Sequence, residues 1–216
     1  MFAGGASDIL KASNSLICMK MKKVRNVTKG EKTRQRLLEV SAALFAEHSY
    51  HGTRVSDIVS AAGVTQPSFY SYFKTKDEIY QLLLDKFDEE LEELVVSMLI
   101  DASLPKEDVQ KNITASFRKY LDFFTHHHHL TKISMFQPPQ SDATRNKLHK
   151  WIVRNMHLEQ QRGFFSQEIS VDVLAGCYLG ILIQTLLEEP DVSELEAISH
   201  ERGKFLYGGL TYKTAK

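Results

Sequence analysis

Short polar side chains and one phenol gather on one side of the segment 66–72. If this segment is a helix, a rotation of 100° per residue turns Phe69 and Phe73, four residues apart, toward a core. The same rotation turns four residues outward: Pro67, Ser68, Tyr70 and Ser71. Hydroxyl groups on such a face can approach base edges and phosphate oxygens closely. The chemistry that this segment predicts is hydrogen bonding to a nucleic acid, and no catalytic residue is expected in it.

Four consecutive histidines, His126 to His129, are the second place where chemistry is conceivable. His126 and His129 would share a helix face, and His149 or His157 would have to complete a metal site. The alternative, which we favour, is a polar helix end, where the helix dipole stabilises protonated imidazole. We therefore expect no metal and no cofactor. An all-α metal-dependent enzyme that uses His126–His129 is kept as the alternative function.

The elements that must position these residues are predicted to be helices. From residue 31 onward, apolar residues recur at spacings of three and four, and no run alternates strictly at two. We expect an all-α fold of about nine helices: 32–48, 55–62, 66–72, a long helix from about 76 with an apolar stripe from Ile79 to Met98, one with a stripe from Val109 to Phe124, a short segment ending near Phe136, 142–162, 171–187, and a last helix up to 208.

The second and third of these helices are separated by only three residues, which is a helix-turn-helix pattern. Gly63 can take the positive φ that ends a helix, Thr65 is suited to be an N-cap, and Pro67 falls in the first turn, where it is tolerated. A tight helical hairpin within a bundle would show the same spacing. Three further predicted helices have capping residues at their N-termini: Thr75 with Glu78, Ser170, and Ser193 with Glu196.

The charge distribution helps to separate these alternatives. The 216 residues contain 27 Lys and Arg and 27 Asp and Glu, and a neutral chain by itself argues against binding to nucleic acid. However, residues 20–76 hold 11 basic and 4 acidic residues, a net charge of +7, so the remainder carries −7. Charge runs are most often solvated faces. Here the basic run coincides with the helix-turn-helix, which favours DNA as the partner.

Composition excludes several other classes of protein. Hydrophobic residues make up 43% of the chain and charged residues 25%, values that exclude disorder as the main state. Two cysteines, Cys18 and Cys177, exclude a disulfide scaffold and fit a reducing compartment. The longest uncharged apolar stretch, 173–187, has 15 residues, fewer than the roughly 20 that span a bilayer. We expect a cytoplasmic protein without a membrane partner.

The first residues differ in composition from the rest. They lack the basic start and long apolar stretch of a signal peptide, and Met19 and Met21 precede a basic run. We expect either that the natural start lies at one of these methionines or that residues 1–28 are a flexible N-terminal arm or extension. Residues 29–76 would then form the helix-turn-helix domain, and residues 77–216 a second helical domain.

The stretch 33–78 resembles the DNA-binding domain of tetracycline-repressor (TetR) family regulators. The residues that carry the resemblance are Thr33-Arg34, Leu37-Leu38, Ala42, Leu44-Phe45, Tyr50, Thr53, Val55, Asp57-Ile58, Ala61-Ala62-Gly63-Val64 and Phe69-Tyr70-Ser71-Tyr72-Phe73-Lys74-Thr75-Lys76-Asp77-Glu78. Two features depart from the family pattern: Ser49 stands where Gly usually precedes the aromatic residue, and the N-terminal arm is long. Beyond residue 80 only the length and the helix layout are similar.

The resemblance implies a role for each matching position in DNA binding. Four residues would read bases in the major groove, beside Pro67 on the same face: Thr65, Gln66, Ser68 and Ser71. Six would hold phosphates: Tyr70, Tyr72, Lys76, Thr33, Thr53 and Arg54. Lys76 would be helped by the N-terminal dipole of the fourth helix. Lys29 and Lys32 are further candidates for contacts to the DNA backbone.

The resemblance also implies two tasks for residues 77–216. One is an effector pocket, for which the aromatic cluster supplies Phe117, Tyr120, Phe124, Phe136, Trp151 and Tyr178, although most aromatic residues here are expected in the core. The other is a dimer interface of the last two helices, with Leu174, Tyr178, Ile181, Leu182, Thr185, Leu195, Ile198, Arg202 and Phe205. The helix 171–187 is apolar nearly all round, so a central core helix is the alternative. Gly176 and Gly180 would permit close approach of a neighbouring backbone. Few buried charges are expected in the pocket, which favours an apolar or aromatic effector.

The function that these observations predict is a ligand-responsive, DNA-binding transcriptional regulator. It would act as a homodimeric repressor on a palindromic, double-stranded DNA operator and be released by a small-molecule effector. Activation instead of repression stays open. Besides the metal-dependent enzyme, a helical adaptor that binds only protein is the remaining alternative.

Overall fold

The computed structural model of the protein describes residues 28–212 and is all-helical over that range, which confirms the all-α fold class. The expected arm over residues 1–28 lies, apart from Thr28, outside the described residues. Nine α-helices follow one another, with a 3₁₀ turn and a π-helical turn between them: α2 Lys29–Gly52, α3 Val55–Ala62, α4 Gln66–Tyr70, α5 Lys76–Ser97, η1 Lys106–Asp108, α6 Val109–His126, α7 His128–Thr131, η2 Lys132–Phe136, α8 Gln140–Gln161, α9 Val171–Leu187 and α10 Leu195–Leu210.

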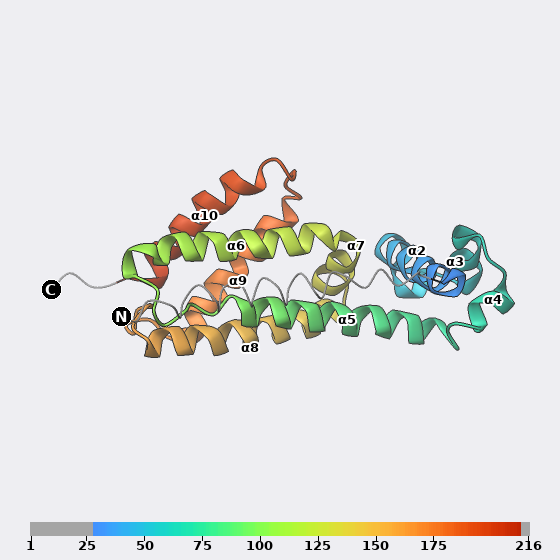
Figure 1. Cartoon of the computed structure of the whole chain (residues 1–216), viewed down its shortest axis with the longest axis horizontal. Coiled ribbons are helices and arrows are strands. Elements are labelled where there is room, and N and C mark those ends of the chain that lie inside the picture. The colour runs from blue at the N-terminus through green and yellow to red at the C-terminus, as the bar shows by residue number, and fades with distance from the viewer. Residues whose placement is uncertain (1–27, 213–216) are drawn as a thin grey trace, which may run out of the picture.

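The molecule is elongated, with α2, α3 and α4 at one end and α6, α8, α9 and α10 at the other (Figure 1). Each end has its own hydrophobic core, and α5 runs between the two ends. Ile79 and Leu83 of α5 belong to the core of the helix-turn-helix end, whereas Phe87 and Leu91 belong to the larger core. The smaller core also contains Ile133 of η2, so residues far apart in the sequence join the two ends.

The local signals at the helix-turn-helix behave as the sequence predicts. Gly63 takes φ +64°, the left-handed conformation that ends α3, and the hydroxyl of Thr65 accepts a hydrogen bond from the amide of Ser68 at 3.4 Å. Helix α4 is shorter than expected because it ends at Tyr70, and Ser71 and Tyr72 form a turn.

Capping at the other predicted starts differs in detail. The hydroxyl of Thr75 accepts from the Glu78 amide at 3.1 Å, but the Glu78 carboxylate accepts from the Lys74 amide instead of closing the box on Thr75. The box expected for Ser193 and Glu196 is wrong. There Asp191 accepts from Ser193, and α10 begins two residues later, at Leu195. Ser170 is the N-cap of α9 but makes no side-chain capping bond.

Ser49 interrupts α2 directly after the expected helix end at residue 48. Its φ of 62° and ψ of 169° lie in a region of backbone space that suits glycine, because a Cβ atom is crowded there. The Ser49 carbonyl oxygen accepts a hydrogen bond from the Thr53 hydroxyl at 2.8 Å. The departure from the family pattern at this position is therefore a strained backbone position in the turn between α2 and α3.

Helices α5 and α8 are joined by a buried carboxylate and its partners. Asp88 of α5 is only 8% exposed. Its carboxylate lies 2.6 Å from Nζ of Lys147 and accepts a hydrogen bond from Thr144 at 3.4 Å, both from α8. A carboxylate on the border of an apolar stripe can be buried when a partner helix supplies its counter-ion.

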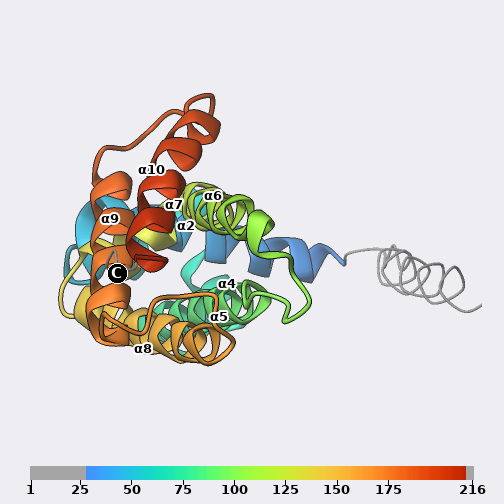
Figure 2. The same ribbon diagram turned by 90° about the vertical axis from the view of Figure 1, so that its left-hand side faces the viewer.

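Helix α10 packs closely along α6, as Figure 2 shows from the end of the molecule. Gly203 makes this possible, because a Cβ atom at that position would lie 2.7 Å from Cα of Thr114 in α6. By contrast, nothing lies within 4 Å of a Cβ atom placed on Gly176 or Gly180 of α9. These two glycines therefore face open space in the single chain.

Candidate nucleic-acid interface and effector cavity

Helix α4 presents an outward face at the end of the molecule. Phe69 is fully buried and Phe73 is 2% exposed, whereas Tyr70 is 54% exposed. The rings of Phe69 and Tyr70 stand edge to face at 5.4 Å, so the buried ring supports the exposed one. Gln66 and Pro67 are also exposed, and the hydroxyl of Ser71 donates to the Ser68 carbonyl at 2.6 Å. The orientation follows the helical rotation expected from the sequence. The base contacts themselves stay a prediction.

Two of the residues expected to hold phosphates lie beside the first turn of α2. Tyr72 is half-buried, and a Cβ atom on Gly30 would lie 3.6 Å from the Tyr72 hydroxyl oxygen. Thr33 is half-buried and donates its hydroxyl to the Lys29 carbonyl at 3.0 Å. The first turn of a helix carries amide groups without internal partners, which suit an anion. The geometry brings these residues to one helix start.

Thr53 does not offer its side chain to DNA. It is 1% exposed, and its hydroxyl donates to the carbonyl oxygens of Ser49 at 2.8 Å and Leu44 at 3.2 Å. The side chain therefore closes the end of α2 instead of holding a phosphate, which corrects the expected role. The neighbouring Arg54 is exposed, and its amide is held by the Asp57 carboxylate at 2.8 Å.

Lys76 makes contacts within the protein that the family resemblance does not imply. Its Nζ donates to the carbonyl oxygens of Tyr50 at 2.7 Å and Thr53 at 2.8 Å, and lies 4.1 Å from the centre of the Tyr50 ring. The Tyr50 hydroxyl donates to Asp77, and this bond raises the pKa of Tyr50 to about 12. Lys76 thus joins the start of α5 to the α2–α3 turn. Only one ammonium proton remains for a phosphate.

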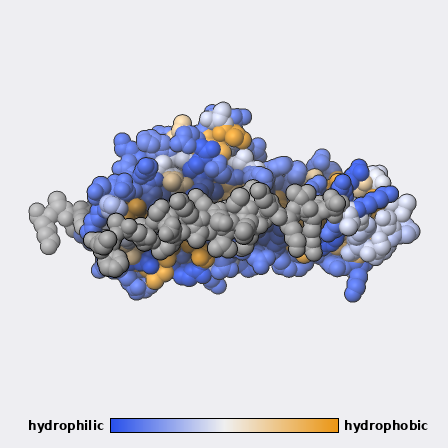
Figure 3. Space-filling view, in the orientation of Figure 1, coloured by the Kyte–Doolittle hydropathy of each residue, from blue (hydrophilic) through white to orange (hydrophobic). Residues whose placement is uncertain are grey.

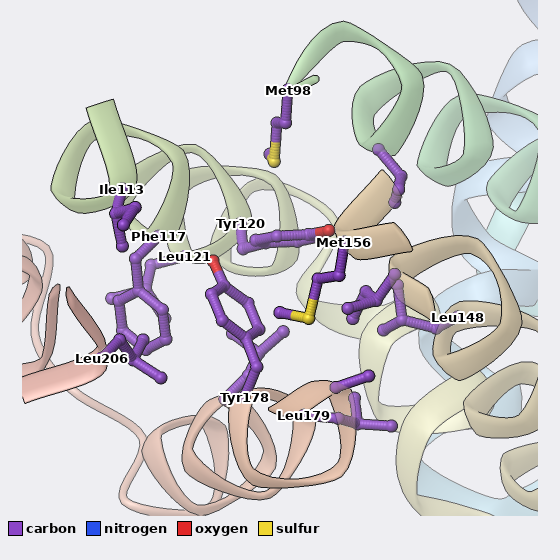
Figure 4. Close-up of a cluster of buried hydrophobic side chains, with 14 of the residues drawn as sticks. Met98, Ile113, Phe117, Tyr120, Leu121, Leu148, Met156, Tyr178, Leu179 and Leu206 are labelled. Carbon is purple, nitrogen blue, oxygen red and sulfur yellow. The ribbon is translucent and has the colours of Figure 1, made fainter. Parts of the chain in front are cut away.

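A cavity of about 50 Å³ lies inside the second end of the molecule. Tyr120 of α6 and Tyr178 of α9 line it, and Figure 4 shows these two side chains next to each other, with Met98 and Met156 nearby. The two tyrosine rings are 5.8 Å apart, edge to face. The complete lining is Val95, Met98, Ile100, Asn112, Ile113, Ser116, Tyr120, Ile152, Asn155, Met156, Glu159, Phe165, Tyr178 and Leu210. Small-molecule sites commonly enclose about 300–1,000 Å³, so an effector must widen this one.

Only two of the six aromatic residues expected in the pocket, Tyr120 and Tyr178, line this cavity. Phe117 is fully buried against Tyr178 as part of the core. Phe124 and Phe136 line a second hollow of about 480 Å³ near the end of α9. Trp151 lines neither space and packs against the larger core. The aromatic composition indicated the part of the chain that contains the cavity. It did not distinguish the residues that line the cavity from the residues that fill the core.

The cavity contains a carboxyl group, against the expectation of few buried charges. Glu159 is 5% exposed, and its Oε1 accepts a hydrogen bond from the Ile100 amide at 3.2 Å. Burial raises the pKa of Glu159 to about 7. The signal was present in the sequence, because Leu148, Ile152, Met156 and Glu159 follow the helical spacing of one buried stripe on α8.

Helices α9 and α10 bury five of the nine expected interface residues within the chain. Five of them are under 9% exposed: Leu174, Tyr178, Leu182, Thr185 and Leu195. They pack on the body of the same chain, which corrects their assignment to a dimer interface. Four reach the surface: Ile181, Ile198, Arg202 and Phe205, the last 73% exposed. An apolar helix contacts the core with one face and leaves the other free, and the composition does not reveal which face is which.

The histidine run makes local contacts. His128 and His129 approach each other at 3.1 Å between their Nε2 atoms, and His127 Nε2 lies 3.4 Å from the Glu90 carboxylate. In the part of the chain that the structure describes, no three His, Cys, Asp or Glu side chains are placed to hold a metal ion. The metal-dependent alternative therefore gains no support from the geometry. No helix over residues 28–212 is long and apolar enough to cross a membrane.

Comparisons with known proteins agree with this geometry. Residues 37–83 match the family described as "Bacterial regulatory proteins, tetR family". The chain is 34% identical over 155 residues to the uncharacterized HTH-type transcriptional regulator YdgC of Bacillus subtilis, covering 72% of this chain and 80% of that protein. It is 30% identical over 149 residues to the HTH-type transcriptional repressor DhaR of a Mycobacterium species, covering 66% and 74%.

A solved structure shows the same fold at lower identity. The transcriptional regulator FadR of Bacillus subtilis, solved with stearoyl-CoA, superposes with a TM-score of 0.58 at 19% identity, over 81% of this chain and 98% of that one. A terminal helix-turn-helix joined to an all-helical body defines the class of ligand-responsive, DNA-binding transcriptional regulators. Within this class, the chain belongs to the tetR family of bacterial regulatory proteins.

Proposed function

We propose that the protein is a repressor that binds a palindromic operator as a homodimer in the cytoplasm and leaves it when a small molecule occupies the cavity. The observation that carries this proposal is the separation of two sites in one chain. The exposed face of α4 lies at one end, the cavity lies at the other, and α5 contributes to both cores. The repressor relative DhaR favours repression over activation.

For the DNA contacts, residues 29–76 form the reading domain and residues 77–216 the effector and dimerisation domain. Gln66, Ser68 and Ser71 on α4 and its following turn face the major groove, with Thr65 at the helix start. Tyr70, Tyr72, Thr33 and Arg54 hold the flanking phosphates. The exposed basic residues of this domain support the assignment through their charge: Lys29, Lys32, Arg34, Arg36, Arg54 and Lys74.

For the homodimer, the free faces of α9 and α10 form the contact. The exposed stripe of α9 begins with Asp172 in the first turn, follows helical spacing and carries no further charge: Val173, Gly176, Cys177, Gly180, Gln184 and Leu187. A groove between the helices is lined by Ile181 and Gln184 of α9 and by Arg202 and Phe205 of α10. The open space at Gly176 and Gly180 lets a partner helix approach. On the face that Figure 3 shows, apolar atoms gather near the protruding end formed by these helices.

Communication between the cavity and α4 passes through α7 and η2. The side-chain amide of Gln137 donates to the carbonyl oxygens of Phe45 at 3.2 Å and Ala46 at 3.0 Å in α2. Thr131 donates its hydroxyl to the Phe124 carbonyl of α6 at 2.8 Å. A ligand that widens the cavity displaces α6 or α8, and these contacts transmit the shift to the reading domain. The two operator-reading surfaces of the dimer then lose their spacing, provided that the ligand prefers the widened conformation.

Selection from random double-stranded DNA, followed by fluorescence anisotropy, tests the proposal. We expect enrichment of a palindrome with half-sites about one helical turn apart, two chains per DNA duplex, and affinity that falls steeply with salt. Failure to enrich any sequence, with unchanged binding to random DNA, would overturn the operator role. A chain that enriches a single half-site as a monomer would overturn the homodimer.

A further inference from the structure

The cavity between α6, α8 and α9 combines aromatic walls with hydrogen-bond acceptors that lack some or all of their donors. Glu159 accepts one bond, from the Ile100 amide to its Oε1. The buried carboxamide oxygen of Asn112, which also lines the cavity, has no partner. Burying such groups without partners costs free energy, so a ligand that supplies donors would bind favourably.

The charge of Glu159 has no counter-ion in direct contact. Arg162 is the cation whose charge acts on it, but Nη1 of Arg162 donates to the Ile100 carbonyl at 2.6 Å. Within residues 28–212, no ion pair joins Glu159 to a basic side chain. The other titratable groups that face it are the hydroxyls of Tyr120 and Tyr178, which burial holds in the neutral form. A positive charge is therefore what this carboxyl group lacks.

The walls suit a cation as well. Tyr120, Tyr178 and Phe165 line the cavity, and aromatic faces attract ammonium groups. The present volume of about 50 Å³ has room for a small head group. Met98 and Met156 also line the cavity, and their flexible thioethers can rearrange to admit a longer apolar body.

We propose that the effector is an amine: a protonated amino group that pairs with the Glu159 carboxylate inside the cavity, joined to an apolar or aromatic body. This proposal rests on the proposed role of the cavity as the effector site. It differs from the ligand of FadR, whose solved structure contains stearoyl-CoA, an anionic molecule. A carboxylate or phosphate head group would instead meet Glu159 as a like charge.

The pH dependence of binding follows from the same pairing. Burial raises the pKa of Glu159 to about 7, so the free protein holds a mixture of neutral and ionised carboxyl groups near that pH. An amine binds the ionised form, and its affinity should therefore rise up to about tenfold per pH unit below pH 7 and level off above it. A ligand that needs the neutral carboxyl group would show the opposite trend.

Matched ligands test the proposal by isothermal titration calorimetry on the full chain. Hexyl, decyl and 4-phenylbutyl tails each carry, in turn, an ammonium, a hydroxyl or a carboxylate group, and decanoyl-CoA is added as an acyl thioester. For at least one tail, we expect the amine to bind about tenfold or more tightly than the alcohol. The variant Glu159→Gln keeps an acceptor for the Ile100 amide and should abolish this preference. The control Glu93→Gln, the same change on the exposed face of α5, should retain it.

Three outcomes would overturn the amine assignment: tighter binding of a carboxylate or of decanoyl-CoA, an unchanged amine affinity in Glu159→Gln, or no binding of any amine at millimolar concentration. Each of these leaves the proposed function intact if the chain still binds its operator. If the wild-type chain without ligand does not bind an operator, that result would instead contradict the proposed function. Measuring anisotropy of labelled operator in the same samples separates the two failures.

Discussion

The side-chain amide of Gln137 donates a hydrogen bond to the main-chain carbonyl oxygen of Phe45, 3.2 Å away. The two residues are 92 positions apart, and Phe45 is fully buried in the core of the reading domain. This bond, with its companion to Ala46, is a direct polar link between the body and α2. Under the proposed function, this link is expected to couple α2 to the position of the segment around η2.

Removing this link should loosen the reading domain. In Gln137→Ala two partly buried carbonyl oxygens lose a donor, and we expect the free energy of unfolding to fall by about 1–2 kcal/mol. Amide hydrogen exchange in α2 should accelerate, and a ligand that releases the wild-type operator complex should release the variant less completely. Gln161→Ala, on the exposed end of α8, serves as the control. Equal exchange rates in the two variants would contradict this role for Gln137.

Tyr70 should contribute strongly to operator binding, because it is the exposed aromatic residue of α4. We expect Tyr70→Ala to weaken binding at least about tenfold in a gel shift or anisotropy titration. Tyr70→Phe separates the hydroxyl from the ring: a similar loss assigns the effect to a hydrogen bond with phosphate. Tyr212→Ala removes a tyrosine that is 48% exposed at the other end of the described chain and should leave binding unchanged. An unchanged titration for Tyr70→Ala would exclude the phosphate role.

Phe205 should be required for dimerisation. Its side chain is 73% exposed beside the groove between α9 and α10, and Phe205→Asp places a charge where a partner would bury it. Analytical ultracentrifugation should show a dimer for the wild type and a monomer for this variant, with operator affinity reduced in parallel. Val96→Asp introduces the same charge at an exposed residue of α5 and should remain dimeric. A dimer of normal affinity in Phe205→Asp would place the interface elsewhere.

Ser49→Gly should stabilise the protein. Relief of the strained backbone at φ 62° and ψ 169° is expected to raise the free energy of unfolding by about 1 kcal/mol, after the greater entropy of glycine in the unfolded chain is included. Ser60→Gly, in the regular helix α3, should have the opposite sign. Urea unfolding of the three proteins measures both changes. Destabilisation by Ser49→Gly would show that the Ser49 hydroxyl matters more than the strain.

Glu159 should make the stability depend on pH. Its pKa is raised by burial from 4.5 to about 7, so the folded protein binds the proton more tightly than the unfolded chain does. Stability contributed by the neutral carboxyl group is therefore fully present below about pH 4.5 and is lost as the pH rises through about 7. Glu159→Gln removes this loss, and above pH 7 it should be more stable than the wild type by about 1–3 kcal/mol. A stability difference that does not change with pH would contradict the raised pKa.

Local sequence signals were sufficient to predict the helices, the turn at Gly63 and the inward direction of Phe69 and Phe73. These features depend on signals within a few residues: apolar spacing, a capping hydroxyl, and a glycine at positive φ. The family pattern over residues 33–78 follows from the same local signals. For this reason the helices of the helix-turn-helix and the direction of its core residues were predictable, whereas the partners of Thr53 and Lys76 were not.

Contacts between distant segments do not follow from these local signals and become visible in the folded chain. Thr53 and Lys76 were assigned to phosphates, but they donate hydrogen bonds to carbonyl oxygens at the end of α2 and in the α2–α3 turn. Glu159 was overlooked, because its burial requires α8, the end of α5 and α9 to close around it. The free face of α9 was equally hidden, since an apolar helix shows no polarity difference until its neighbours are in place. Periodicity specifies a local conformation, whereas the partner of a side chain depends on which elements meet in space.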